Sequence, residues 1–233
     1  MLLSLVTGSL NRPESLKRLI DSIVTHTDVE WELIIAEASE QPAENIWGER
    51  VKILHEQPRL GYVKGYNLAF AAATGKWILY LNDDAEVQPG YAKAAVDFME
   101  ANPDVGLGAL YYREGANPFR VWTCYGMVYA NFGIISRELG NQLGWFDDDL
   151  QMYGADNALS FKVLLAGKGI ASIPGARVVH YVHEDRFRLD NQKHRMADSQ
   201  LLQQRYYSRL EDMRVVYDRF RRLSGPEKLS DYQ

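Results

Sequence analysis

The sequence predicts an α/β fold in which a mostly parallel central sheet is flanked by helices and followed by a C-terminal helical tail. Short apolar segments alternate with helical segments through the first 110 residues, and this alternation is typical of a parallel sheet covered by helices. After about residue 185, arginine and glutamine accumulate, which sets the tail apart. With 46% apolar residues among 233, the chain is able to bury a full core.

The first strand and the first helix are predicted within residues 2–23. Residues 2–6 form a short apolar segment that runs into a polar loop, as expected of a buried strand. Asn11 and Glu14 have the spacing of a helix-capping pair. Four apolar residues then recur on one helical face: Leu16, Leu19, Ile20 and Ile23.

The same unit continues along the first half of the chain. Further strands are predicted at 31–36, 51–54, 77–81 and 105–110, and helices at 68–73 and 91–102. In open sheets of this kind, ligands bind beyond the carboxyl ends of the strands. Polar residues that directly follow a strand are therefore the candidates for a functional site.

The strongest local signal is the pair Asp83 and Asp84, which follows the apolar strand at 77–81. Two carboxylates at a ligand-binding edge suit Mg²⁺ or Mn²⁺, which prefer oxygen ligands and are often shared with substrate phosphates. The alternative is an ordinary solvated turn, where acidic residues are common. Position after a buried strand favours the metal site, but spacing alone does not decide between the two.

Composition and charge exclude several classes of protein. The net charge of −5 argues against a general nucleic-acid binder, which needs clustered positive charge. The single cysteine, Cys124, excludes an internal disulfide and a multi-cysteine zinc site. No apolar run is long enough to cross a bilayer, and residues 1–6 are too short for a signal peptide. We therefore expect a cytoplasmic protein, with peripheral contact to a membrane as an open alternative.

Several motifs occur in one order along the chain, which makes the pattern specific. They are LGYVKGYNLA at 60–69, ATGKW at 73–77, LNDDAEV at 81–87, GWFD at 144–147, MYGAD at 152–156 and ARVVH at 176–180. Together they resemble glycosyltransferase family 2 with the GT-A fold, over roughly residues 2–183. In detail the chain is most similar to bacterial and viral members, such as rhamnosyltransferases, that build surface polysaccharides.

The resemblance implies a divalent cofactor, Mn²⁺ or Mg²⁺. Asn82-Asp83-Asp84 stands at the place of the family's DXD motif, which makes Asp84 the metal ligand and puts Asp83 nearer the ribose or diphosphate. His180 would complete the coordination, since a neutral imidazole suits manganese. His183 and Glu184 are nearby alternatives, and a lone histidine after a strand is more often structural.

The resemblance also implies a nucleoside-diphosphate sugar as donor. Thr7, Ser9 and Arg12 lie in the loop that touches the base, Glu37 matches the acid at the base or ribose, and Lys64 would meet the diphosphate. Each is otherwise an ordinary surface residue. The family often has Asp-Asp-Gly-Ser where this chain has Glu37 followed by alanine and serine, so the nucleotide pocket is expected to differ.

Asp156 matches the family's catalytic base at the start of a helix. The alternative is that it only caps that helix. Ala155 and Ala158 replace acids that are common in the family. Without these like charges, Asp156 would keep an ordinary pKa of about 3.9 unless burial compensates. On the acceptor side Trp145 is the preferred sugar-stacking residue, although buried aromatic residues usually belong to a core.

The function implied is inverting, metal-dependent transfer of a sugar to a hydroxyl of a glycan or lipid-linked acceptor. A catalytically impaired nucleotide-sugar-binding protein is the alternative, because Ala155 and Ala158 depart from the family. A nucleotidyltransferase is disfavoured, since no glycine-rich basic loop follows the first strand.

We expect a GT-A domain at 1–185, made of a nucleotide-sugar-binding half at 1–110 and an acceptor and catalytic half at 111–185, and a helical extension at 186–233. Helices are predicted within 195–223, where seven arginines alternate with apolar residues. Such helices either lie on an anionic membrane or pack on the domain or a second subunit. Four acidic residues in this stretch favour packing.

Overall fold

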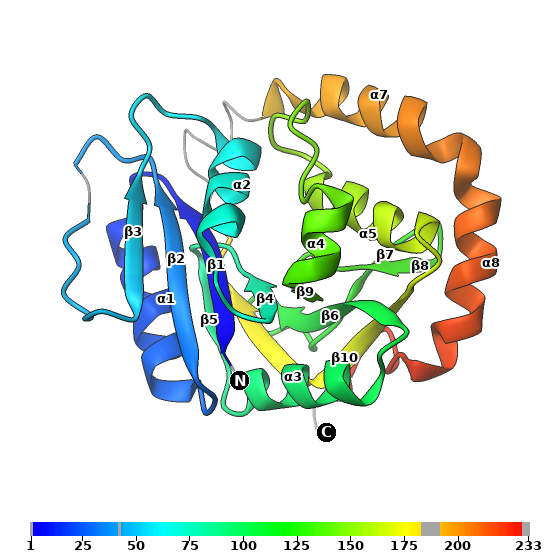
Figure 1. Cartoon of the computed structure of the whole chain (residues 1–233), viewed down its shortest axis with the longest axis horizontal. Coiled ribbons are helices and arrows are strands. Elements are labelled where there is room, and N and C mark those ends of the chain that lie inside the picture. Colours follow the sequence, from blue (N-terminus) through cyan, green and yellow to red (C-terminus); the bar gives the residue numbers. More distant parts are fainter. Residues whose placement is uncertain (1, 42, 183–191, 230–233) are drawn as a thin grey trace.

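The computed structural model describes residues 2–41, 43–182 and 192–229 (Figure 1). An eight-stranded sheet forms the centre of the molecule, in the order β3-β2-β1-β4-β9-β6-β10-β5. Its strands are β1 (Leu3–Ser9), β2 (Trp31–Glu37), β3 (Val51–His55), β4 (Trp77–Tyr80), β5 (Ala85–Val87), β6 (Val105–Arg113), β9 (Gly133–Ser136) and β10 (Gly169–His180). A separate hairpin pairs β7 (Trp122–Cys124) with β8 (Met127–Tyr129).

The sheet is mostly parallel, as predicted. Strand β1 pairs in parallel with both β2 and β4, β2 pairs in parallel with β3, and β6 pairs in parallel with β10. The exceptions are β9, which lies antiparallel between β4 and β6, and β5, which pairs antiparallel with β10. The carboxyl ends of β1, β2 and β4 therefore meet at one edge of the sheet.

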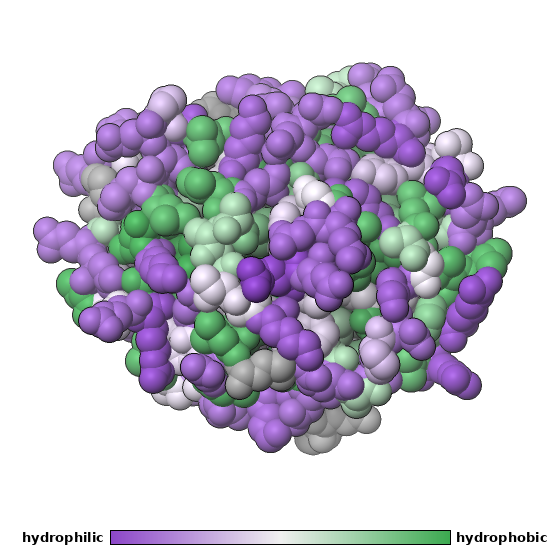
Figure 2. Space-filling view, in the orientation of Figure 1, coloured by the Kyte–Doolittle hydropathy of each residue, from purple (hydrophilic) through white to green (hydrophobic). Residues whose placement is uncertain are grey.

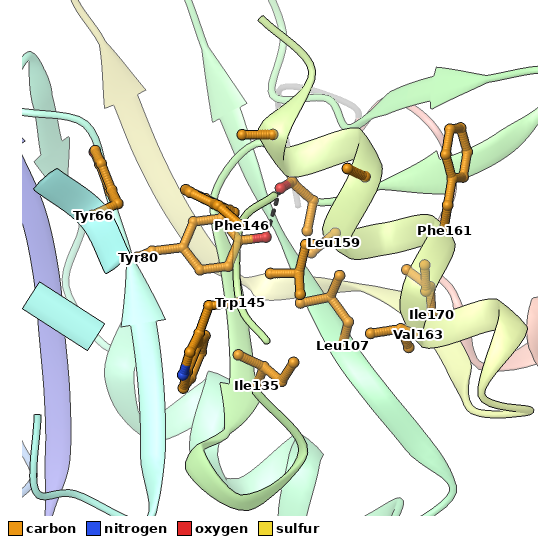
Figure 3. Close-up of a cluster of buried hydrophobic side chains, with 14 of the residues drawn as sticks. Tyr66, Tyr80, Leu107, Ile135, Trp145, Phe146, Leu159, Phe161, Val163 and Ile170 are labelled. Carbon is orange, nitrogen blue, oxygen red and sulfur yellow. Dashed lines mark hydrogen bonds between the residues drawn. The ribbon is translucent and has the colours of Figure 1, made fainter. Parts of the chain in front are cut away.

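Helices cover both faces of the sheet (Figure 1). Helices α1 (Pro13–His26) and α3 (Tyr91–Ala101) pack with β1, β2 and β10 in one buried cluster. Helices α2 (Tyr62–Ala72), α4 (Arg137–Leu143) and α5 (Ala155–Leu165) lie with the second cluster on the opposite face. Figure 3 shows this second cluster, in which Tyr80 packs beside Phe146 and its hydroxyl donates a hydrogen bond to the carbonyl of Ala130, at 2.7 Å.

The predicted Asn11 cap of α1 is wrong. The helix begins after Arg12, and no side chain caps its first turn. Asn11 instead has a left-handed backbone, with φ of 52°, and its Oδ1 accepts the N–H of Glu40, at 3.3 Å. The side chain is used to join the loops after β1 and β2, so a long-range contact replaces the local one.

Several elements were not predicted from the sequence. The three-residue strands β5, β7 and β8 are too short to show a periodicity, and α4 has only seven residues. Helix α2 begins at Tyr62 rather than at residue 68, because Gly61 with φ of 93° starts it. Strand β10 is twelve residues long, and the sequence indicated only that a strand precedes His180.

The C-terminal extension packs on the domain. It consists of α7 (Arg195–Tyr206) and α8 (Leu210–Phe220), joined and followed by short 3₁₀ turns, η1 (Tyr207–Arg209) and η2 (Arg221–Leu223). Leu202, Tyr206, Met213 and Tyr217 are buried in the second cluster. In Figure 2 the surface over α7 is largely hydrophilic. Leu202 and Tyr206 of this helix are turned towards the domain, whereas Met196 is 76% exposed. The predicted boundary near residue 185 lies outside the described residues.

Candidate active site

A cavity of about 690 Å³ lies at the carboxyl ends of β1, β2 and β4. Its walls come from the loops that follow these strands, from the loop before α2, from the loop before α5 and from the start of α7. The lining includes Ser9, Arg12, Arg59, Tyr62, Asp83, Asp84, Asn131, Tyr153, Asp156 and residues 192–195. Segments far apart in the sequence thus meet around one space.

Asp83 and Asp84 lie at the floor of this cavity and are both buried. The hydroxyl of Ser9 donates to Oδ2 of Asp83, at 3.1 Å. Nη1 of Arg12 lies 3.6 Å from Oδ1 of Asp83 and 3.5 Å from Oδ2 of Asp84. Burial and the neighbouring charge of Asp84 raise the pKa of Asp83 to about 7, against the opposing effect of Arg12. The two carboxylates thus share the guanidinium of Arg12, and Ser9 adds a hydrogen bond to Asp83.

His180 lies between two carboxylates. Its Nε2 is 3.1 Å from Oδ1 of Asp84, and its Nδ1 is 3.1 Å from Oε1 of Glu114. Burial by itself would lower the pKa of His180, but the two carboxylates outweigh burial and raise it above its usual value. The strand β10 ends at His180 beside β5, and this pairing brings the imidazole to Asp84.

The donor set at this point fits a divalent cation shared with a substrate. A carboxylate oxygen of Asp84 and an imidazole nitrogen of His180 are ligands that Mn²⁺ accepts, and phosphate oxygens commonly complete such a shell. Within residues 2–41, 43–182 and 192–229, no three acidic, histidine or cysteine side chains are gathered as a metal cluster. The described residues would therefore supply only part of the coordination. His183 and Glu184, the alternatives to His180, lie outside the described residues.

Asp156 lines the same cavity from the first turn of α5. Its Oδ1 accepts the N–H of the next residue, Asn157, at 2.9 Å, and the helix has no side-chain cap. Burial raises the pKa of Asp156 to about 6. The sequence predicted an ordinary pKa for Asp156 unless burial compensated for the missing acids, and burial does raise it. Ala155 and Ala158 are fully buried in the second cluster, where acidic side chains would have no solvent.

The other predicted donor residues divide into two groups. Ser9 and Arg12 line the cavity, whereas Thr7, Glu37 and Lys64 are not part of its lining. Thr7 and Glu37 are buried on β1 and β2, and Lys64 is exposed on α2. Oε1 of Glu37 accepts the N–H of Ser39, at 3.0 Å, and this bond shapes the loop that continues into the cavity wall.

Trp145 lies in the core. It is 7% exposed, and its ring stacks on Phe70 with centroids 4.4 Å apart. Its Nε1 donates to Oδ1 of Asn141, at 2.9 Å. In Figure 3 Trp145 lies beside Ile135 among the buried side chains, and it is not part of the cavity lining. This position gives no support to the predicted contact with an acceptor sugar.

Some residues of the cavity were missed in the sequence. Tyr62 lies within the motif at 60–69 and Arg59 directly precedes it, so their place in or beside that motif was an available signal. Lys193, His194 and Arg195 had no local signal, because they enter the wall only through the folding of α7 over the loop before α5. Only tertiary contacts identify them.

Comparison with known proteins extends these observations. The model of the family described as "Glycosyl transferase family 2" matches residues 4–164. An uncharacterized glycosyltransferase of Haemophilus influenzae is 23% identical over 109 residues, which are 46% of this chain and 37% of that protein. Polypeptide N-acetylgalactosaminyltransferase 11 of Xenopus tropicalis is 23% identical over 177 residues, covering 59% of this chain and 29% of that protein. The match therefore spans well under half of each relative.

Two solved structures share the fold. Staphylococcus aureus TarS (residues 1–349) in complex with UDP-GlcNAc has a TM-score of 0.66 at 14% identity, covering 80% of this chain and 60% of TarS. GalNAc-T7 with UDP, GalNAc and Mn²⁺ has a TM-score of 0.66 at 17% identity, covering 78% of this chain and 43% of that one. These matches confirm the predicted GT-A fold. Because the family model covers more than half of the chain, this protein belongs to glycosyl transferase family 2.

Proposed function

We propose that this protein transfers a sugar from a nucleoside-diphosphate sugar to a hydroxyl group of an acceptor. The observation that carries the proposal is that Asp84, after β4, and Asp156, in the first turn of α5, line one cavity of about 690 Å³. A donor site and a base must face a common space for the acceptor oxygen to reach the sugar. If Asp84 and Asp156 lay on opposite surfaces of the molecule, the reaction would be excluded.

The donor is proposed to be a uridine diphosphate sugar. TarS was solved with UDP-GlcNAc, and GalNAc-T7 with UDP and Mn²⁺. In this chain Ser9 ends β1 and Arg12 lies in the loop after it, and both would hold the diphosphate side of the donor beside Asp83. The guanidinium of Arg12 is placed to turn from the two carboxylates to the phosphates when the donor enters, since it already lies in the cavity wall.

Asp84 and His180 would hold Mn²⁺ or Mg²⁺. Such a cation acts as a Lewis acid and stabilises the charge that develops on the diphosphate as it leaves. Glu114 would fix the orientation of the imidazole, because its Oε1 lies 3.1 Å from Nδ1 and leaves Nε2 turned towards Asp84.

Asp156 is the proposed general base. With a pKa of about 6 it is ionised at neutral pH and is better matched to taking a proton than an ordinary aspartate. Its position at the wall lets an acceptor hydroxyl approach from the open side of the cavity. Direct attack by that hydroxyl inverts the anomeric centre. We propose a glycan or lipid-linked glycan as acceptor.

The alternative of an impaired binding protein was motivated by Ala155 and Ala158. Both are buried on the core side of α5, and the pKa of Asp156 is raised without neighbouring acids. The substitutions therefore have a packing explanation, and this removes the reason for preferring the alternative.

The test combines binding with chemistry. Thermal unfolding is measured with UDP alone, Mn²⁺ alone and both, because a ligand that binds the native state raises Tm. We expect the largest shift with both, and Asp84→Asn should abolish the part that needs Mn²⁺. Asp104→Asn, a change at an exposed aspartate on the far end of the sheet, is the matched control.

Transfer is then measured with UDP-GlcNAc and UDP-Gal as test donors and a panel of sugar acceptors, with the product anomer read by NMR. Release of UDP that depends on Mn²⁺ and on Asp156 supports the proposal. If the Mn²⁺-dependent shift in Tm persists in Asp84→Asn, residues other than Asp84 bind the metal. A product with retained anomeric configuration would contradict direct attack by the acceptor hydroxyl.

A further inference from the structure

We propose that Asp198, on helix α7, is a positioning residue that holds the loop before α5 in the shape that presents Asp156 to the cavity. Residue 198 lies outside the family match, which ends at residue 164. The C-terminal extension would therefore complete the active site. The inference rests on the proposed function only for the role of Asp156, and the contacts themselves are independent of it.

The carboxylate of Asp198 is fully buried, at 0% exposure. Its Oδ1 accepts the N–H of Gln151, at 2.9 Å, and its Oδ2 accepts the N–H groups of Met152 and Tyr153, at 3.0 and 2.8 Å. Three successive backbone donors thus converge on one side chain. Such a concave group of N–H donors binds an anion well, and here the anion is supplied by the chain itself.

The loop at residues 151–153, which Asp198 holds, leads directly to Asp156, the proposed base. Gly154 follows with a left-handed backbone, φ of 78°, and α5 begins at the next residue. A Cβ built on Gly154 would lie 2.2 Å from Cδ1 of Leu202, so α7 contacts the backbone at this point. The three N–H bonds and the Leu202 contact together fix the direction in which α5 starts, and therefore the place of Asp156.

A second set of contacts holds α7 to the start of the same loop. The hydroxyl of Tyr206 donates to Oδ2 of Asp147, at 2.6 Å, and Nη1 of Arg205 lies 3.3 Å from the same oxygen. Nζ of Lys162, from α5, donates to the other oxygen of Asp147, at 2.8 Å. Segment 147–153 is thus held by α7 at both ends, and by α5 as well at Asp147.

Helix α7 also touches the cavity. Arg195, the first residue of α7, belongs to the cavity lining together with Tyr153, and so do Lys193 and His194, which directly precede the helix. The guanidinium of Arg195 lies 5.9 Å from the ring centre of Tyr153. In Figure 1 the start of α7 lies next to the loop that precedes α5. The helix is therefore a wall of the site as well as the support of its loop.

The test uses the full chain with Asp198→Asn, which keeps the shape but places an N–H₂ group against backbone donors, and Asp198→Glu, which keeps the charge. Asp218→Asn, at an exposed aspartate of α8, is the matched control. Hydrogen exchange of the amides of residues 151–153 is the first readout. We expect slow exchange in the wild type and in the control, at least tenfold faster exchange in Asp198→Asn, and a partial return in Asp198→Glu.

Kinetics and binding are the second readout. We expect kcat for transfer to fall about 10- to 100-fold in Asp198→Asn, while the Kd for UDP with Mn²⁺ stays within about twofold, because Ser9, Arg12 and Asp84 are untouched. A role in stability alone would lower the fraction of protein that binds UDP and leave kcat per binding site unchanged. That outcome would overturn the inference.

Two further measurements keep the inference falsifiable if Asp198→Asn does not fold. The wild-type amides of residues 151–153 must exchange slowly, and Tyr206→Phe, which removes one bond to Asp147, must lower kcat about two- to fivefold with unchanged UDP binding. Fast exchange in the wild type contradicts the inference by itself. A wild type with slow exchange but no transfer activity contradicts the proposed function instead.

Discussion

The two sides of the cavity are built in different ways. On the side proposed for the donor, Ser9 and Asp83 meet because β1 and β4 are paired in parallel, with Val6 opposite Tyr80. Ser9 is the last residue of β1, and Asp83 follows β4 by three positions. On the other side, Asp156 is placed by a loop that is held from α7, a helix beyond the family match. Sheet register alone assembles the first side, whereas the second depends on a buried charge from a distant helix.

The difference shows what a parallel sheet supplies without further support. Its strand ends bring residues 74 positions apart into hydrogen-bonding distance, as for Ser9 and Asp83. A loop that leaves the sheet has no such register, and its backbone donors need another partner. Asp198 is that partner for residues 151–153.

The largest effect is expected at Asp156. Asp156→Asn should lower transfer by about 10²- to 10⁴-fold, the usual contribution of a general base, with UDP binding retained. In the wild type, kcat should rise with pH through about 6, because the base acts only when ionised. Retained transfer in the variant would exclude Asp156 as the base.

The same variant should be more stable above pH 6. The folded pKa of about 6 lies above the ordinary 3.8, so ionisation of Asp156 costs stability as the pH rises between these values. Asparagine removes this cost, which we expect to be about 1–2 kcal/mol after allowance for solvent in the cavity. Urea unfolding at pH 5 and pH 8 measures it, and an equal difference at both pH values would contradict the explanation.

A substitution of Trp145 distinguishes a role in the core from the predicted contact with an acceptor sugar. Trp145→Ala should reduce the free energy of unfolding by about 3–5 kcal/mol, because it removes a buried ring stacked on Phe70. Trp122→Ala, at a ring that is 38% exposed, is the control and should cost far less. A stable Trp145→Ala protein with a raised KM for the acceptor would restore the predicted sugar contact.

Glu32, on β2 and away from the cavity, is expected to stabilise the first part of the sheet. Its carboxylate accepts the hydroxyl of Ser4 and the N–H and hydroxyl of Thr74, each at 2.7 Å, and lies 2.9 Å from Nζ of Lys52. Burial alone would raise its pKa, but these donors lower it from 4.5 to about 2.

The stabilisation from Glu32 is therefore present above pH 4.5 and lost as the pH falls towards 2. Glu32→Gln should cost about 2 kcal/mol at pH 7 and progressively less below pH 4.5. Denaturant unfolding across this pH range checks the prediction, with the exposed Glu49→Gln as control. A cost that does not change with pH would show that the carboxylate charge is unimportant.

The smallest effect is expected at Arg205. Its guanidinium pairs with Asp147 and Asp149 at the surface, where solvent screens the charges. Arg205→Gln should cost about 0.5 kcal/mol, and the cost should shrink at 1 M salt. A larger, salt-independent loss would mean that the docking of α7 depends on this pair more than on Asp198 and Leu202.

The predicted membrane and dimer contacts of the extension stay predictions. None of the helices in the described part of the chain is long and apolar enough to cross a membrane. The packing of Met213 and Tyr217 against the domain accounts for the apolar face of α8. The narrower resemblance to rhamnosyltransferases is likewise untested.

The sequence by itself determined the parallel α/β layout, the place of Asp83 and Asp84 at a strand end and the place of Asp156 at a helix start. The layout and the place of Asp83 and Asp84 follow from local burial patterns, since the strands and helices of the sheet are apolar on the faces they bury. The place of Asp156 follows from the resemblance to the family. Only the tertiary structure decided that Trp145 belongs to the core, that burial raises the pKa of Asp156, and that α7 supports the loop before α5. Each of these three features depends on residues that are distant along the chain, and a local sequence pattern does not indicate which distant residues will be in contact.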